Sequence, residues 1–178
     1  MTGYTWAPRK YRRYGRSDSK GPVIAAAVLA ALIAVSGAKE AGHARSAAPA
    51  AAASVAAEAV AYARGQFGKP YLWGGTGPDA FDCSGLAMMA YRSAGVGIAR
   101  TSQRQWATER HVPASRVQAG DLVFFAGADG TMTDPGHVGI VTGHGQMIEA
   151  YATGYPIRVA SYDRSDLVGF AQPWGGGA

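Results

Sequence analysis

Hydrophobic and polar residues follow two different repeats along the chain, and the change between them divides the folded part into two halves. In the first half, apolar residues recur at helical spacing, as in Val55, Ala59 and Tyr62. Ser54 is placed to cap the first helix, and a glycine and a proline follow its last turn. This half predicts helices over 54–66, 83–94 and 102–110.

The second half, from Val117 onward, contains short apolar runs separated by Gly, Pro and Asp. The run Leu122-Val123-Phe124-Phe125 has no polar position, which is typical of a strand buried on both faces. Helices followed by an antiparallel meander of strands favour an α+β fold over a parallel α/β sheet. The predicted strands are 122–125, 137–142, 146–151, 157–160 and 167–170.

The first 38 residues have the layout of an export signal. A basic start is followed by an uncharged apolar run over 22–35 and by the small residues Ser36-Gly37-Ala38. A retained membrane anchor is the alternative, because extension to Ala38 reaches the roughly 17 residues that a span requires. We therefore predict a signal peptide or membrane anchor over 1–38, with the rest of the chain exported.

The remaining sequence divides into three parts by composition. Residues 39–53 are rich in Ala and offer little that could be buried, so we predict an Ala/Pro-rich linker there, with room for some helix. Residues 54–174 form the predicted folded domain, and 175–178 form a predicted disordered tail.

The net charge of +5 is concentrated at the N-terminus. Residues 1–20 contain six Lys or Arg and one Asp, whereas the rest of the chain holds eleven basic and eleven acidic side chains. A body without net charge argues against nucleic-acid binding. We expect a monomer that touches the membrane only through its N-terminal segment.

Cys83 is the only cysteine of the chain, so no intrachain disulfide can form. It stands at the predicted start of a helix, with Asp82 as N-cap and Gly95 as the C-terminal stop. The positive end of the helix dipole favours a thiolate at this position. A buried, inert thiol is the alternative interpretation.

His137 opens a predicted strand, and the hairpin that follows determines which residue can reach it. A three-residue connection, 143–145, places Thr142 opposite Gln146 and brings Glu149 onto the face of His137. A four-residue connection would turn Glu149 to the other face. The register of this hairpin is therefore a prediction about the site.

Together these residues suggest nucleophilic catalysis, with Cys83 as nucleophile, His137 as base and then acid, and Glu149 orienting the imidazole. A metal site is the other use of Cys, His and Glu. It is disfavoured, because the chain has no Cys-x-x-Cys or His-x-x-x-His pair. We expect no metal and no cofactor.

Six blocks of sequence, in this order, resemble the NlpC-type cysteine peptidases, papain-like enzymes that cut the peptide stems of bacterial cell wall. The resemblance spans about Val55 to Trp174 and implies N-terminal helices carrying the cysteine, packed on a C-terminal antiparallel sheet carrying the histidine. The matching blocks are Pro70-Tyr71-Leu72-Trp73-Gly74-Gly75, Phe81-Asp82-Cys83-Ser84-Gly85-Leu86, Arg100-Thr101-Ser102 with Gln105, Ala119-Gly120-Asp121-Leu122-Val123-Phe124-Phe125, Gly136-His137-Val138-Gly139-Ile140 and Met147-Ile148-Glu149-Ala150.

The resemblance also implies roles for individual residues. Cys83 would be the nucleophile and His137 the base, and the third polar position falls on Glu149, where many relatives have His. The hydroxyl of Tyr71 would hold the oxyanion together with the backbone N–H of Cys83. Three further residues would grip the charged stem peptide along the groove: Asp82, Ser84 and Arg100.

The implied function is a peptidoglycan endopeptidase that cleaves the stem between D-glutamate and the diamino acid, through an acyl-enzyme on Cys83. Such a protein would be secreted, or anchored to the outer face of the bacterial cytoplasmic membrane, and would act on the cell wall. Two alternatives stay open. One is an amidase or acyltransferase on the same scaffold, and the other is a non-catalytic cell-wall-binding module.

Overall fold

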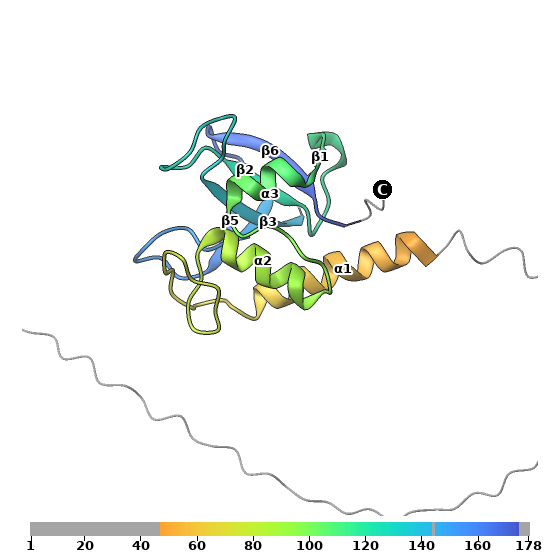
Figure 1. Cartoon of the computed structure of the whole chain (residues 1–178), viewed down its shortest axis with the longest axis horizontal. Coiled ribbons are helices and arrows are strands. Elements are labelled where there is room, and N and C mark those ends of the chain that lie inside the picture. Colours follow the sequence, from red (N-terminus) through yellow and green to blue (C-terminus); the bar gives the residue numbers. More distant parts are fainter. Residues whose placement is uncertain (1–46, 144, 175–178) are drawn as a thin grey trace, which may run out of the picture. The chain divides into compact units, whose positions relative to one another are not determined.

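The computed structural model describes residues 47–143 and 145–174, which form helices packed against one antiparallel sheet (Figure 1). The helices are α1 (Ala47–Arg64), α2 (Cys83–Ser93), α3 (Ser102–Thr108) and the short 3-10 helix η1 (Ala114–Arg116). The strands are β1 (Arg110–Val112), β2 (Leu122–Phe125), β3 (His137–Gly143), β4 (Gln146–Glu149), β5 (Arg158–Ser161) and β6 (Leu167–Gln172). The predicted α+β class is confirmed.

The strands lie in the order β1-β6-β2-β3-β4-β5, and every neighbouring pair is antiparallel. Strands β2 to β5 form the expected meander. The expectation of a simple meander was wrong for β6, which returns across the sheet to pair with β2, and for β1, which was not predicted. Strand β1 has only three residues and no alternating burial, so its sequence carries no strand signal.

Helix α1 begins earlier than predicted. Ser54 lies inside the helix rather than at its start, and its hydroxyl donates a hydrogen bond to the carbonyl of Ala51 at 2.7 Å. Alanine has the strongest helix propensity, so the helix extends back into the segment that we predicted to be a linker. Residues 47–53 are therefore helical.

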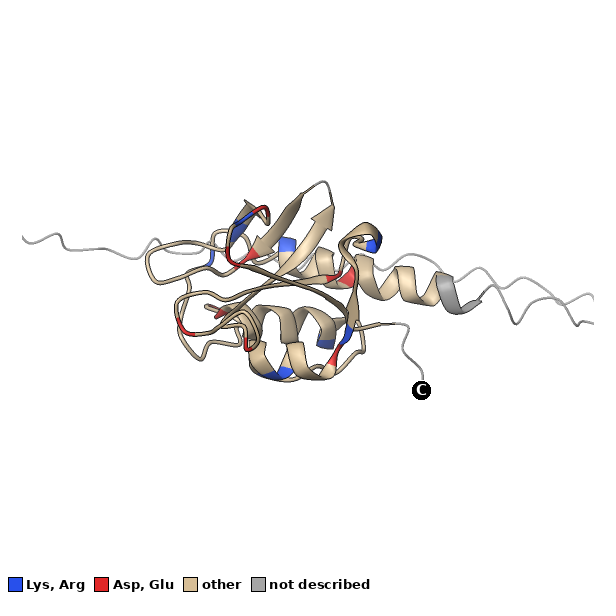
Figure 2. Ribbon diagram, turned by 90° about the horizontal axis from the view of Figure 1, so that it is seen from above, with Lys and Arg blue, Asp and Glu red and all other residues tan. Residues whose placement is uncertain are grey.

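Several predictions concern residues that the structure does not describe: the export signal over 1–38, the first part of the linker and the tail over 175–178. Within 47–143 and 145–174, no helix combines the length and apolarity needed to cross a membrane. Figure 2 shows basic and acidic residues interspersed over this part of the chain.

Strand β2, inside the sheet, is buried on both faces, as its apolar sequence predicts. One face packs against α1 and α2, where Tyr91 stacks on Trp174 at a ring-centroid distance of 6.0 Å and donates a hydrogen bond to the carbonyl of Gly120. On the other face, side chains from β2, β3, β4 and β6 form a smaller cluster: Val123, Phe125, Val141, Met147 and Phe170.

The β3–β4 hairpin has the predicted register where it matters for the site. Ile140 pairs with Ile148, and one step further along this register Gly139 lies opposite Glu149. The turn itself differs from the prediction, because Gly143 rather than Thr142 pairs with Gln146. A bulge at Thr142 absorbs the extra residue, so the face of Glu149 is unchanged.

The first turn of α2 lies in close contact with the segment that precedes it. The amide of Asp82 donates to the carbonyl of Gly75 at 3.0 Å. A Cβ atom added at Gly85 would lie 2.1 Å from that carbonyl oxygen and 2.9 Å from Asp82 Oδ1. Only glycine allows the helix to start this close to the loop, and this approach fixes where Cys83 stands.

We predict that Gly85→Ala destabilises the domain by roughly 1–3 kcal/mol, because a backbone carbonyl cannot move aside for the methyl group. Helix propensity alone would favour Ala over Gly by about 1 kcal/mol, so the predicted sign is opposite to that of propensity. Urea unfolding measures the effect. Gly97→Ala is the control, since its Cβ would meet nothing within 4 Å. A Gly85→Ala variant as stable as wild type would contradict this packing.

Candidate active site

A cleft with a volume of about 890 Å³ lies between the start of α2 and the start of β3. Helix α2 carries Cys83 as its first residue, and β3 carries His137 as its first residue. The two elements pack against each other, so both side chains open onto the same cleft. The predicted residues that border it are Tyr71, Asp82, Cys83, Ser84, Arg100 and His137.

Cys83 is held by the predicted N-cap. Asp82 has extended backbone angles, and its Oδ1 accepts a hydrogen bond from the amide of Gly85 at 2.6 Å. The thiol is only partly buried and faces the cleft, with its Sγ 4.0 Å from the carbonyl oxygen of Gly136. This position does not fit the alternative of a buried, inert thiol.

His137 is 6% exposed and is bound by the residue that the hairpin register predicts. Its Nε2 lies 3.0 Å from Oε2 of Glu149, which is 1% exposed. Because Nε2 is taken by the carboxylate, Nδ1 is the ring nitrogen that can exchange a proton with Cys83. The ring of Tyr151 meets the imidazole edge-on at a centroid distance of 5.6 Å and limits its rotation.

The surroundings of His137 favour its charged form. Burial by itself disfavours the imidazolium, but the interactions with Cys83 and Glu149 outweigh burial and raise the pKa of His137 to about 9. At neutral pH the ring therefore carries a proton that it can give to a leaving group.

Glu149 has two further partners that the sequence interpretation missed. Arg158 binds its Oε1 through Nε at 3.2 Å and Nη2 at 3.1 Å, and Arg164 Nη1 lies 3.5 Å from Oε2. Burial would raise the pKa of Glu149, but His137 and Arg158 outweigh burial and hold that pKa below its usual value. The pairing of β4 with β5 was the missed signal, because it sets Arg158 directly opposite Glu149.

Tyr71 borders the cleft beside Cys83. Burial, followed by the negative charges of Cys83, Asp82 and Asp129, raises the pKa of the Tyr71 hydroxyl to about 12. The phenol therefore keeps its proton at neutral pH and can donate a hydrogen bond to a developing oxyanion. The backbone N–H groups in the first turn of α2 have no acceptor within the helix, so they are further hydrogen-bond donors at the helix start.

Asp82, Ser84 and Arg100 form one cluster at the wall of the cleft. Arg100 binds both carboxylate oxygens of Asp82, at 3.0 and 2.5 Å, and its Nη1 also donates to Ser84 Oγ at 3.0 Å. Asp82 Oδ2 additionally accepts from the amide of Gly74 at 2.9 Å. Asp82 thus caps α2, ties down the preceding loop and neutralises Arg100 within the cleft.

Gln105, which belongs to one of the matching blocks, has a structural role. It is fully buried, and its Nε2 donates to the carbonyls of Ser84 at 3.1 Å and Ala99 at 2.8 Å. Among the described residues, no group of three or more His, Cys, Asp or Glu side chains is arranged to hold a metal ion. The arrangement instead combines a thiol, a charged imidazole, a buried carboxylate and a phenol donor.

We predict that Glu149→Gln lowers the pKa of His137 from about 9 toward its ordinary value of 6.5, because the charge that stabilises the imidazolium is removed. When the pH is raised, the His137 ring of this variant therefore loses its proton at a lower pH than the ring of the wild-type protein. NMR titration of ¹⁵N-labelled histidine rings measures this, with the His137 signal assigned from a His137→Gln sample. Glu58→Gln, an exposed change on α1, is the control. An unchanged titration near pH 9 would show that Glu149 does not set the charge of His137.

Comparison with protein families matches residues 68–168 to the NlpC/P60 family, a range that includes Cys83, His137 and Glu149. A probable endopeptidase of Corynebacterium glutamicum is 48% identical over 102 residues, which cover 57% of this chain and 46% of that protein. The probable endopeptidase p60 of Listeria monocytogenes is 43% identical over 95 residues, or 53% of this chain and 19% of that protein. The chain thus spans less than half the length of these relatives.

Solved structures show the same fold. An NlpC/P60 family protein from Bacillus cereus superposes with a TM-score of 0.63 and 27% identity, covering 67% of this chain and 40% of that one. The peptidoglycan hydrolase RipB of Mycobacterium tuberculosis superposes with a TM-score of 0.60 and 32% identity, covering 69% of this chain and 66% of RipB. The family match takes in more than half of the chain and agrees with the papain-like arrangement of its helices and sheet. The chain is therefore a member of the NlpC/P60 family.

Proposed function

We propose that this protein is a cysteine-type peptidoglycan endopeptidase. The observation that carries the proposal is the cleft in which Cys83 stands beside His137, whose imidazole is bound by the buried carboxylate of Glu149 at 3.0 Å. Curated relatives are named probable endopeptidases, and RipB is described as a peptidoglycan hydrolase. Both names support a wall peptide as the substrate.

In the first half of the reaction, the sulfur of Cys83 attacks the carbonyl carbon of the scissile amide and forms a C–S bond. The carbonyl oxygen becomes an oxyanion that accepts hydrogen bonds from the Tyr71 hydroxyl and the backbone N–H of Cys83. The imidazolium of His137 donates its proton to the amide nitrogen as the C–N bond breaks. The amine product leaves, and a thioester remains on Cys83.

In the second half, His137 is neutral and accepts a proton from a water molecule. The resulting hydroxide attacks the thioester carbon, the C–S bond breaks, and the carboxylic acid product leaves. Cys83 departs as a thiolate, so the original thiolate–imidazolium pair is restored. Glu149 stays ionised throughout and keeps the ring oriented, so its role is that of the third member of a triad.

The substrate groove supports a charged peptide as ligand. Arg100 offers a guanidinium, with its side chain 35% exposed, and Ser84 adds a hydroxyl beside it, while the buried carboxylate of Asp82 holds both side chains in place. A stem peptide carries carboxylate groups that a guanidinium can bind. We assign the cut to the bond between D-glutamate and the diamino acid, as the family resemblance implies.

The proposed place of action is outside the cytoplasmic membrane, either secreted or anchored to its outer face. The basic and apolar sequence of residues 1–38 supports export. An exported free thiol is exposed to oxidation, so full activity would require Cys83 in its reduced state.

We predict that the reduced full chain, incubated with purified cell wall, releases fragments with a new N-terminus on the diamino acid, identified by mass spectrometry. Cys83→Ala lowers this release by more than about a thousandfold, because the nucleophile is lost, while its thermal unfolding stays close to that of wild type. A new N-terminus on the first stem residue instead would indicate an amidase. Undiminished hydrolysis by Cys83→Ala would overturn the mechanism, and wall binding without any product would favour a binding module.

A further inference from the structure

The buried carboxylate of Glu149 contacts three cationic side chains from three segments of the domain. His137 comes from β3, Arg158 from β5, and Arg164 from the loop between β5 and β6. Each oxygen of the carboxylate has its own set of partners. Oε1 accepts both hydrogen bonds from Arg158, whereas Oε2 lies 3.0 Å from His137 and 3.5 Å from Arg164.

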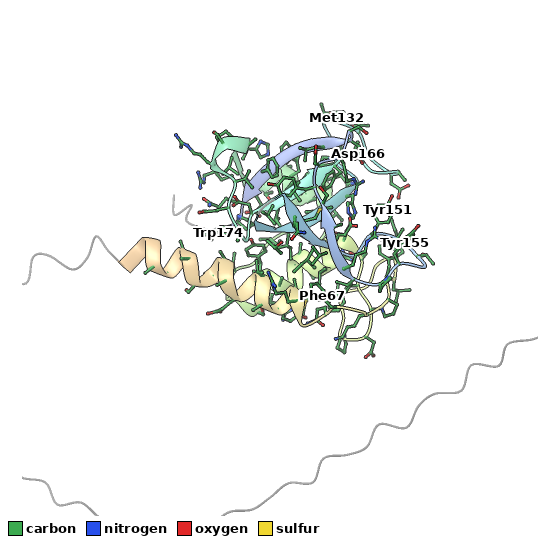
Figure 3. All side chains as sticks on the ribbon, turned by 180° about the vertical axis from the view of Figure 1, so that it is seen from behind. Phe67, Met132, Tyr151, Tyr155, Asp166 and Trp174 are labelled. Atoms are coloured by element: carbon green, nitrogen blue, oxygen red, sulfur yellow. The ribbon has the colours of Figure 1, made fainter. Side chains whose placement is uncertain are left out.

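Aromatic rings hold both guanidinium groups in place. The Arg158 guanidinium carbon lies 4.8 Å from the ring centroid of Tyr155 and 5.5 Å from that of Tyr151. Arg164 lies over the ring of Phe125 at 4.3 Å and over that of Tyr151 at 5.5 Å. Figure 3 shows Tyr151 and Tyr155 beside each other at this end of the sheet. Tyr151 therefore contacts both arginines and His137.

Arg164 also links Glu149 to the loop that leads into His137. Its guanidinium makes two hydrogen bonds with Asp166, at 3.0 and 2.9 Å, and Asp166 Oδ2 accepts from the amide of Gly127 at 3.3 Å. Gly127 has a φ of +64°, and a Cβ added there would lie 3.1 Å from Cβ of His137. The contacts thus lead from His137 through Glu149, Arg164 and Asp166 to Gly127, whose backbone lies beside His137.

The positive charges of the two arginines matter most at one stage of the proposed reaction. Once His137 has given its proton to the leaving amine, Glu149 faces a neutral imidazole. A buried carboxylate without a charged partner tends to take up a proton, because burial disfavours its charge. A protonated Glu149 could no longer orient His137 for the attack of water. Arg158 and Arg164 remain charged throughout and can keep the carboxylate ionised at this stage.

We propose that Arg158 and Arg164 are positioning residues that fix the Glu149 carboxylate, so that one of its oxygens stays bound to His137 through both halves of the reaction. The inference rests on the proposed cysteine-peptidase function. It assigns neither arginine to the substrate. It adds to the triad a pair of cations that act through Glu149, and Arg164, which also borders the cleft, is itself held by Asp166.

The test is a double-mutant cycle in the full chain that combines Arg158→Met with Glu149→Gln. The readout is the rate of alkylation of Cys83 by iodoacetamide from pH 4 to 10, followed by intact mass, which needs no wall substrate. The charged groups that face Glu149 are His137, Arg158 and Arg164, and Cys83 faces His137. Without Arg158, Glu149 becomes protonated at higher pH, so alkylation on the acid side is expected to fall roughly tenfold.

In the Glu149→Gln background, Arg158→Met is expected to change alkylation by less than about twofold, because no carboxylate is left to fix. Arg158→Lys keeps the charge but not the paired contacts, so it should restore the acid side while wall hydrolysis stays several-fold below wild type. Arg164→Met should give the same fall on the acid side, and any part of the fall that persists in the Glu149→Gln background is due to the contact of Arg164 with Asp166. Arg116→Met, at an exposed position outside the cleft, is the matched control.

Equal losses in the wild-type and Glu149→Gln backgrounds would overturn the proposal, because the arginine would then act on the fold or on the substrate. Thermal unfolding of each variant separates these two cases. If the methionine variant does not fold, the several-fold loss of wall hydrolysis in Arg158→Lys is compared between the wild-type and Glu149→Gln backgrounds instead. Failure of the proposed function looks different. In that case the cycle would show coupling in alkylation, while the wild-type chain would release no wall fragments.

Discussion

The contact between His137 and the buried carboxylate of Glu149 is the interaction on which the site depends. It joins the first residue of β3 to the last residue of β4, so it exists only if the hairpin has one particular register. It also opposes burial, which alone would discharge both groups. The charged imidazole and the ionised carboxylate each stabilise the other. The guanidinium groups of Arg158 and Arg164 lie against the same carboxylate and offset the cost of its burial further.

Cys83 depends on a separate constraint on the helical side of the cleft. Asp82 caps α2, binds the amide of Gly74 and pairs with Arg100, while Gly85 lets the helix start against the preceding loop. These contacts hold Cys83 on one layer, and the hairpin holds His137 on the other. Packing of α2 against β3 then brings the two halves to a common cleft.

Much of this arrangement could be predicted from sequence, because its signals are local. The cap at Asp82, the strand Leu122–Phe125 and the contact between His137 and Glu149 each follow from neighbouring residues or from one short turn. What could not be predicted depends on the tertiary structure. The edge strand β1 is too short to show a pattern, the return of β6 is a matter of topology, and Arg164 reaches Glu149 from a loop fifteen residues further along the chain. The position of Arg158 could have been predicted with one further step, since pairing the two predicted strands would have placed it opposite Glu149.

The proposed function makes Cys83 the nucleophile of a wall-cutting reaction. Because the chain has a single cysteine, iodoacetamide can modify one thiol only, and the claim can be tested by titration. Hydrolysis of purified wall is measured in samples that carry increasing fractions of one adduct per chain, counted by intact mass and mapped to Cys83. If Cys83 is the nucleophile, activity falls in proportion to the modified fraction and reaches zero at one adduct per chain. Hydrolysis that persists in fully modified protein would contradict it.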